Sequence, residues 1–200
     1  MRNTLGGQQG ERMVWDEWGR LTRFFESSRI ALAREATLWQ SLELANPDDA
    51  FVRVESGSCT YQVSLAAHTE AVSDTWFLYA SALLSYFALA ESAAAEKLGL
   101  DDLVGLDGAV DWGDRLLASA GTDWRKVHGG RLGMVEVAVV RNLIAHGDRM
   151  YSKRAVTRLT SFGVRPGPAV GDPVVLDDET FREFRARLKS LLNRCGLKEG

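Results

Sequence analysis

Arg141, Asn142 and His146 lie within six residues of one another at the C-terminal end of an apolar run. A guanidinium binds a phosphate through paired N–H donors and stabilises negative charge that builds up on it. An imidazole titrates near neutral pH, so it can take up or release a proton during a reaction. These three groups therefore predict metal-independent RNA cleavage, which leaves a 2′,3′-cyclic phosphate end and a 5′-hydroxyl end.

The helix that must carry these residues separates two of them. Five residues apart on an ideal helix, Arg141 and His146 differ by about 140° around the axis and roughly 7.5 Å along it. Asn142 and His146, four residues apart, share one face. Because one copy gives an incomplete site, we expect a second copy to bring a second motif opposite the first, in a homodimer.

The motif and its flanks resemble the signature of HEPN domains. The motif is Arg141-Asn142-Leu143-Ile144-Ala145-His146-Gly147, preceded by Glu136-Val137-Ala138-Val139-Val140 and followed by Asp148-Arg149-Met150-Tyr151-Ser152-Lys153-Arg154. The resemblance is closest between Trp112 and Leu192 and diffuse over the first 70 residues. It implies a helical bundle, two motifs meeting along a homodimer axis, and a ribonuclease acting as a toxin or antiviral-defence effector. It also implies an antitoxin or another regulatory protein as a partner.

Several neighbours are candidates for supporting roles. Glu136 is predicted to orient Arg141 or to pair with it, and Asp148 stands where some HEPN proteins have a tyrosine. Five cations follow the motif and form a candidate RNA-binding patch: Arg149, Lys153, Arg154, Arg158 and Arg165. These cations track phosphates or form a solvated basic face. Tyr151 stacks on a base or takes part in ordinary packing.

Composition excludes several other classes of protein. The 200 residues are 46% hydrophobic and 26% charged, with a net charge of −3, so RNA binding requires a local basic patch. Two cysteines provide no disulfide framework, and no motif predicts a metal or a cofactor. The polar first ten residues do not form a signal peptide, and we expect a cytoplasmic protein. The apolar run from Trp76 to Ala95 is interrupted by polar residues, so it predicts a buried helix without contact to a membrane.

The hydrophobic periodicity predicts a mainly α-helical, HEPN-like bundle with one small β-hairpin. Residues 1–10 are expected to be a flexible N-terminus, and residues 11–200 a single domain. The N-terminal half should contain helices at 11–27 and 29–45 (or one helix kinked at Ser27-Ser28), a hairpin at 51–56 and 59–66, and a helix at 69–97 that Thr69 or Ser73 caps.

The C-terminal half is predicted to position the motif. A helix is expected at 109–119. A second helix, capped by Thr122 or Asp123 and interrupted at Gly129-Gly130, is expected to continue to His146. A short helix after Ser152, a loop at 161–173 and a final helix capped by Asp177 or Asp178 should follow. Gly147 suits the left-handed position that follows a helix.

Two other functions fit the same residues. One is a catalytically silent HEPN module that binds a nucleotide or a partner protein. The other is a structural subunit of a larger complex. The intact Arg141, Asn142 and His146 favour the endoribonuclease, whereas the acidic net charge favours the alternatives.

Overall fold

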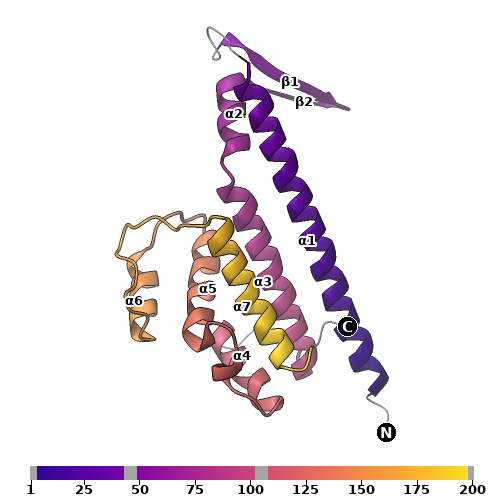
Figure 1. The fold of residues 1–200 in the computed structure, drawn as a ribbon, viewed down its shortest axis with the longest axis vertical. Coiled ribbons are helices and arrows are strands. Elements are labelled where there is room, and N and C mark those ends of the chain that lie inside the picture. Colours follow the sequence, from indigo (N-terminus) through magenta and orange to yellow (C-terminus); the bar gives the residue numbers. More distant parts are fainter. Residues whose placement is uncertain (1–3, 43–48, 102–107, 198–200) are drawn as a thin grey trace. The chain divides into compact units, whose positions relative to one another are not determined.

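The structure, a computed structural model, describes residues 4–42, 49–101 and 108–197. Within these ranges it contains seven α-helices and one two-stranded antiparallel sheet, which confirms the predicted mainly helical fold with a hairpin (Figure 1). Residues 11–200, assigned above to one domain, lie in two compact units. One spans Thr22–Leu78, and the other comprises the chain before and after it.

Helix α1 (Thr4–Gln40) passes through both units without interruption. The prediction of two separate helices at 11–27 and 29–45 is wrong, and a single helix runs through Ser27-Ser28, because serine costs a helix interior only about 0.5 kcal/mol relative to alanine. Residues 4–10, expected to be a flexible terminus, form the first turns of this helix. Residues 1–3 and the predicted end of the second helix at 43–46 lie outside the described residues.

The unit spanning Thr22–Leu78 contains the hairpin. Strands β1 (Phe51–Ser56) and β2 (Cys59–Ser64) pair in antiparallel register, as predicted. Ser64 then caps α2 (Leu65–Ser73) by accepting a hydrogen bond from the Ala67 amide. The single helix predicted at 69–97 is wrong. Asp74 ends α2, and its carboxylate accepts the Trp76 amide at the start of the next helix, at 3.1 Å.

The next helix, α3 (Trp76–Leu98), is the most apolar of the α-helices in the described ranges. It is the one helix among the described residues long and apolar enough to span a bilayer, and half of its most apolar stretch is buried in the structure. Length and composition do not separate a membrane span from a helix buried in a protein core, because both meet the same criteria. In the larger unit its Tyr79 and Tyr86 rings pack against Phe181, and Tyr86 also contacts Trp18 of α1.

Helix α4 (Ala109–Ser119) and a short 3₁₀ turn, η2 (Trp124–Lys126), lead to the motif helix. Asp123 caps η2, and a left-handed Gly129 separates it from α5 (Gly130–Ala145), as the glycine pair predicted. Buried valines and Leu143 fix α5 against neighbours that include α4, α6 and α7.

The last two helices flank α5. Ser152 caps α6 (Lys153–Ser161), and Asp177 caps α7 (Asp178–Arg194), both as predicted. The inner face of α7 is buried through the residues that its periodicity indicated: Phe181, Phe184, Leu188, Leu191 and Leu192. The loop between α6 and α7 returns to the segment before α6 and forms an antiparallel bridge between Met150 and Pro173. The Tyr151 amide donates to the Asp172 carbonyl, and the Tyr151 carbonyl accepts from the Gly171 amide.

Candidate functional site: the C-terminal end of α5

The end of α5 holds His146 in an exposed position. His146 is the C-cap residue, and Gly147 follows it in the left-handed conformation, with φ of +77°. The Gly147 amide donates to the Ile144 carbonyl, and the Asp148 amide donates to the Leu143 carbonyl, both at 2.9 Å. This pair of bonds is the Schellman motif, which satisfies the last carbonyls of a helix. The glycine predicted from sequence therefore ends the helix and leaves the imidazole in solvent.

Arg141 lies on another side of the same helix, toward α3. Its Nη2 pairs with Glu91 at 3.3 Å, its guanidinium lies 5.1 Å from the centre of the Phe87 ring, and its Nη1 donates to Asn142 Oδ1 at 3.0 Å. The side chain is 32% exposed, and its Nε is buried without a hydrogen-bond partner. Burial raises the pKa of Glu91, and the charge of Arg141 opposes that shift. Arg141 is thus held by α3 and in turn holds Asn142.

Asn142 and His146 line a cavity of about 420 Å³ between α5 and α6. The facing wall comes from the start of α6 and the turn before it, and it includes Asp148, Arg154 and Arg158. Val139, Leu143 and Ala155 form its apolar floor, and Ser152 stands at its edge. The cavity thus brings an imidazole, an amide and two guanidiniums together, against a single carboxylate.

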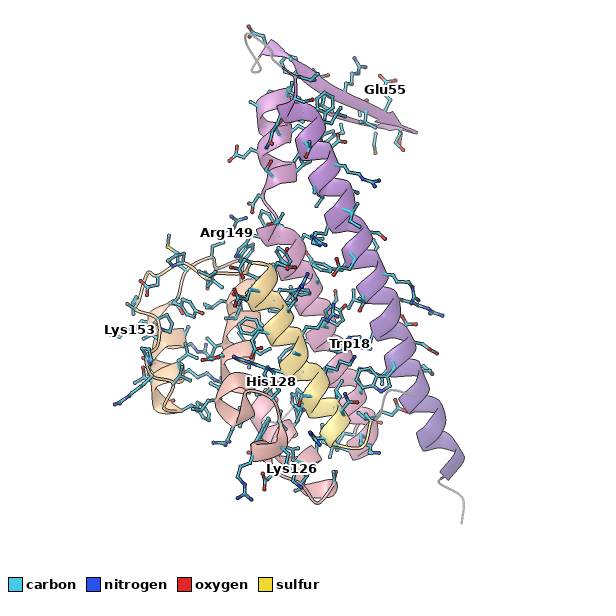
Figure 2. The ribbon with its side chains drawn as sticks, in the orientation of Figure 1. Trp18, Glu55, Lys126, His128, Arg149 and Lys153 are labelled. Atoms are coloured by element: carbon cyan, nitrogen blue, oxygen red, sulfur yellow. The ribbon has the colours of Figure 1, made fainter. Side chains whose placement is uncertain are left out.

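A second, more open basic groove of about 730 Å³ adjoins this cavity along α6. It shares Arg154 and Arg158 with the cavity and adds Lys153 and Phe162. Lys153, at the first position of α6, is exposed and points away from the other helices (Figure 2). Lys153, Arg154 and Arg158 of the predicted cationic patch therefore gather on one helix. Arg149 and Arg165 are exposed but line neither space.

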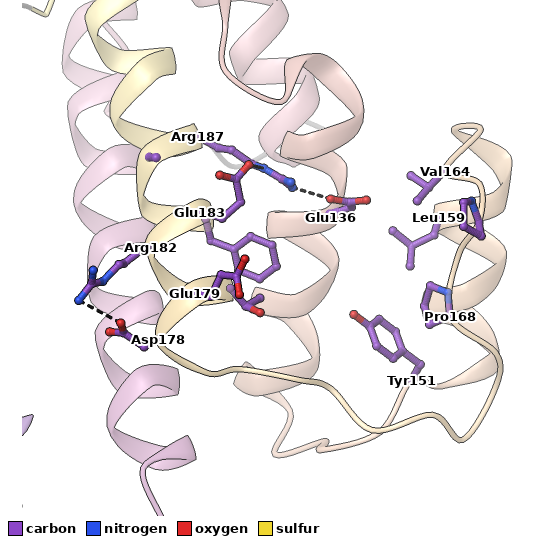
Figure 3. Close-up of a pocket in the computed structure, with 14 residues that line it drawn as sticks. Glu136, Tyr151, Leu159, Val164, Pro168, Asp178, Glu179, Arg182, Glu183 and Arg187 are labelled. Carbon is purple, nitrogen blue, oxygen red and sulfur yellow. Dashed lines mark hydrogen bonds and ion pairs between the residues drawn. The ribbon is translucent and has the colours of Figure 1, made fainter. Parts of the chain in front are cut away.

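Two predicted residues belong elsewhere. Glu136 was expected to orient Arg141, but its carboxylate pairs with Arg187 of α7 at 2.5 Å. That prediction is wrong because Glu136 and Arg141, five residues apart, point to different sides of α5. Tyr151, for which base stacking and ordinary packing were both predicted, lines a different cavity together with Glu136 (Figure 3).

Sequence reasoning missed the partners that hold Arg141. Glu91 is one of few charged residues in the apolar helix α3, and a carboxylate in such a setting requires a cation close by. That requirement was the available signal, but the sequence alone did not identify which cation would answer it. Ser152 was recognised as a helix cap and not as part of a cavity wall.

The described part of the chain contains no group of three or more His, Cys, Asp or Glu side chains that could hold a metal ion. No protein-family model matches this chain, and neither the curated proteins nor the solved structures include a significant match to it.

Proposed function

We propose that this chain is a metal-independent endoribonuclease whose reaction takes place in the His146 cavity. The observation that carries the proposal is the shared lining: an exposed imidazole, the Asn142 amide and the Arg154 and Arg158 guanidiniums border one space of about 420 Å³. A phosphodiester needs cationic donors for its oxygens, and transfer within RNA needs a group that moves a proton. This cavity supplies both.

The reaction follows from these groups. The 2′-hydroxyl oxygen of a ribose attacks the adjacent phosphorus, and the bond between phosphorus and the 5′-oxygen breaks. His146 takes the proton from the 2′-hydroxyl, and the 5′-oxygen leaves with a proton from water or a second acid. Arg154 and Arg158 hold the non-bridging oxygens and stabilise their added charge. The products are a 2′,3′-cyclic phosphate and a 5′-hydroxyl.

Arg141 acts in this proposal as a positioning residue. Its guanidinium contacts Glu91, Phe87 and Asn142, and none of these contacts places it in the cavity. By donating to Asn142 Oδ1, it directs the amide of Asn142 toward the space that His146 borders. The role that the HEPN resemblance assigns to the arginine, direct phosphate contact, would require Arg141 to leave Glu91.

A homodimer completes the proposal. One imidazole performs one of the two proton transfers that the reaction needs, and a second copy would supply the other. Such an interface should bury roughly 1,200 Å² or more in total. Light scattering at micromolar concentration should give twice the 22.1 kDa chain mass. A strict monomer that still cleaves RNA would remove the second copy from the mechanism.

The direct test is cleavage of a short single-stranded RNA in excess EDTA, with the product ends identified by mass spectrometry. The proposal expects cyclic phosphate ends, and it expects no cut where the nucleotide before the scissile bond carries a 2′-O-methyl group. Binding without cleavage would contradict it and favour the silent binding module. Cleavage lost in EDTA would contradict the metal-independent mechanism. The setting of a toxin or defence effector in the cytoplasm, restrained by a partner protein, comes from the family resemblance alone.

A further inference from the structure

A cavity distinct from the His146 cavity and from the basic groove lies on another side of α5. It is larger than the His146 cavity and carries an excess of negative charge. It measures about 800 Å³ and is bordered by α5, α7, the end of α6 and the loop that joins α6 to α7 (Figure 3). This volume falls within the range of cavities that bind small organic molecules. Nothing in the proposed RNA cleavage uses it.

One wall of this cavity is apolar. It consists of Leu159, Val164, Pro166 and Pro168, with the ring of Tyr151 beside them. Leu159 and Val164 are buried against the rest of the fold, so the wall is fixed. Burial raises the pKa of the Tyr151 hydroxyl, and the charges of Glu136 and Asp172 raise it further, which favours the neutral group that can donate as well as accept a hydrogen bond.

The opposite wall is charged, and its guanidiniums already have partners. Arg187 donates to Glu183 at 2.9 Å, to Glu136 at 2.5 Å and to the Gly133 carbonyl at 3.1 Å. Arg182 pairs with Asp178 at 2.9 Å. Because the main cation of this wall is engaged by two carboxylates and a carbonyl, the wall is poorly suited to bind an anion.

The acids of the wall outnumber its cations. Four carboxylates (Glu136, Asp178, Glu179 and Glu183) face two guanidiniums, so two negative charges remain. Glu179 is exposed in the first turn of α7, outside the ion pairs of its neighbours. One oxygen of Asp178, Oδ1, is buried and lacks a hydrogen-bond partner, although Oδ2 binds Arg182. That oxygen is closed to solvent, and the Asp178–Arg182 pair lies on the side of α7 away from Tyr151 (Figure 3), so Glu179 is the acid of this wall that a ligand can reach.

From these walls we infer that the cavity binds an organic cation in which an amidinium or guanidinium group is attached to a flat apolar body. The planar cation would donate paired hydrogen bonds to the carboxylate of Glu179. The apolar body would lie against Tyr151 and the prolines. This inference is independent of the proposed RNA cleavage.

Benzamidine and benzamide provide a matched pair of probes, because they share a ring and differ in the charge of the planar group. Titration calorimetry should show benzamidine binding about 5- to 20-fold more tightly than benzamide, the range expected for added charge-assisted hydrogen bonds. Amide chemical shifts should change at Tyr151, Glu179 and Thr180. Equal binding of the two probes, no binding of either, or shifts confined to other parts of the chain would overturn the inference.

Two variants test whether the carboxylate of Glu179 is the group that binds benzamidine. Glu179→Gln should weaken benzamidine binding severalfold, whereas Glu70→Gln, a change at an exposed acid on α2, should leave it within twofold. An equal loss in both variants would mean general charge attraction and would contradict the assigned site. His146→Ala should bind benzamidine as the parent does, so the inference stands or fails separately from the endoribonuclease.

Discussion

The two cavities that border α5 differ in charge and in how their charged groups are held. At the C-terminal end of the helix, the imidazole of His146 is exposed and Arg154 is exposed beside it. Near the middle of the helix, Arg187 is only 15% exposed and is bound by Glu136, Glu183 and a backbone carbonyl. The Arg187 network stabilises the packing of α5 on α7, whereas His146 and Arg154 are exposed to a substrate.

The strongest test of this difference in stability is Arg187→Ala. It removes the cation that pairs with two partly buried carboxylates, Glu136 and Glu183, so the free energy of unfolding should fall by about 2–3 kcal/mol. The matched control is Arg182→Ala, which removes a pair between side chains that are 63% and 42% exposed and should cost about 0.5 kcal/mol or less. Urea unfolding measures both. Similar losses would show that the Arg187 network is no more structural than a surface pair.

The role of Arg141 is tested by Arg141→Lys. An ammonium keeps the charge toward Glu91 but loses the fork that also reaches Asn142, so kcat should fall about tenfold while KM stays within twofold. In an Asn142→Ala background the same change should have little further effect, because the two residues act through one hydrogen bond. Steady-state kinetics on a labelled RNA measures each variant. A large rise in KM would instead place Arg141 on the phosphate.

Smaller effects are expected along α6. Arg154→Gln removes a cation that lines both the cavity and the basic groove, and it should weaken RNA binding about 3- to 10-fold and reduce its dependence on salt. Arg165→Gln is the control, since Arg165 is exposed in the loop and lines neither space. Fluorescence anisotropy at several salt concentrations separates them. Equal losses would indicate a diffuse basic face.

The smallest effect concerns Glu91. Because its pKa is raised in the folded chain, mainly by burial, the folded state retains a proton that the unfolded state releases above about pH 4.5. This contribution to stability is complete below that pH and is lost as the pH rises through the raised pKa. Glu91→Gln lacks this loss, so its stability relative to the parent should increase between pH 4 and pH 7. A difference that does not change with pH, in urea unfolding, would contradict the assigned burial.

Local signals in the sequence predicted most of the C-terminal half. Ser152 and Asp177 cap helices and Gly147 ends one, because each acts through hydrogen bonds or backbone angles within a few residues. The same reasoning failed at Asp74, whose carboxylate ends one helix and starts the next within what the periodicity indicated was a single helix.

The pairing of charges required information that a sequence does not contain. Glu136 lies five residues from Arg141 and Glu91 lies fifty, yet the more distant acid is the partner. Helix packing decides such pairs, and side chains of one helix that point apart cannot meet. The motif residues themselves were predicted from their types and spacing, and their division between the α3 side and the α6 side became visible only in the structure.

The central claim is that His146 moves a proton in RNA cleavage, and one pair of variants tests it most directly. His146→Ala should lower the rate of cleavage in EDTA by about 10²–10⁴-fold with unfolding unchanged, the usual cost of losing a positioned acid–base group. The control is His128→Ala, which removes another exposed imidazole that pairs with Glu183 at 2.8 Å, and it should cleave within twofold of the parent. If His146→Ala cleaves as fast as the parent, or if both variants lose activity equally, His146 is not the catalytic group.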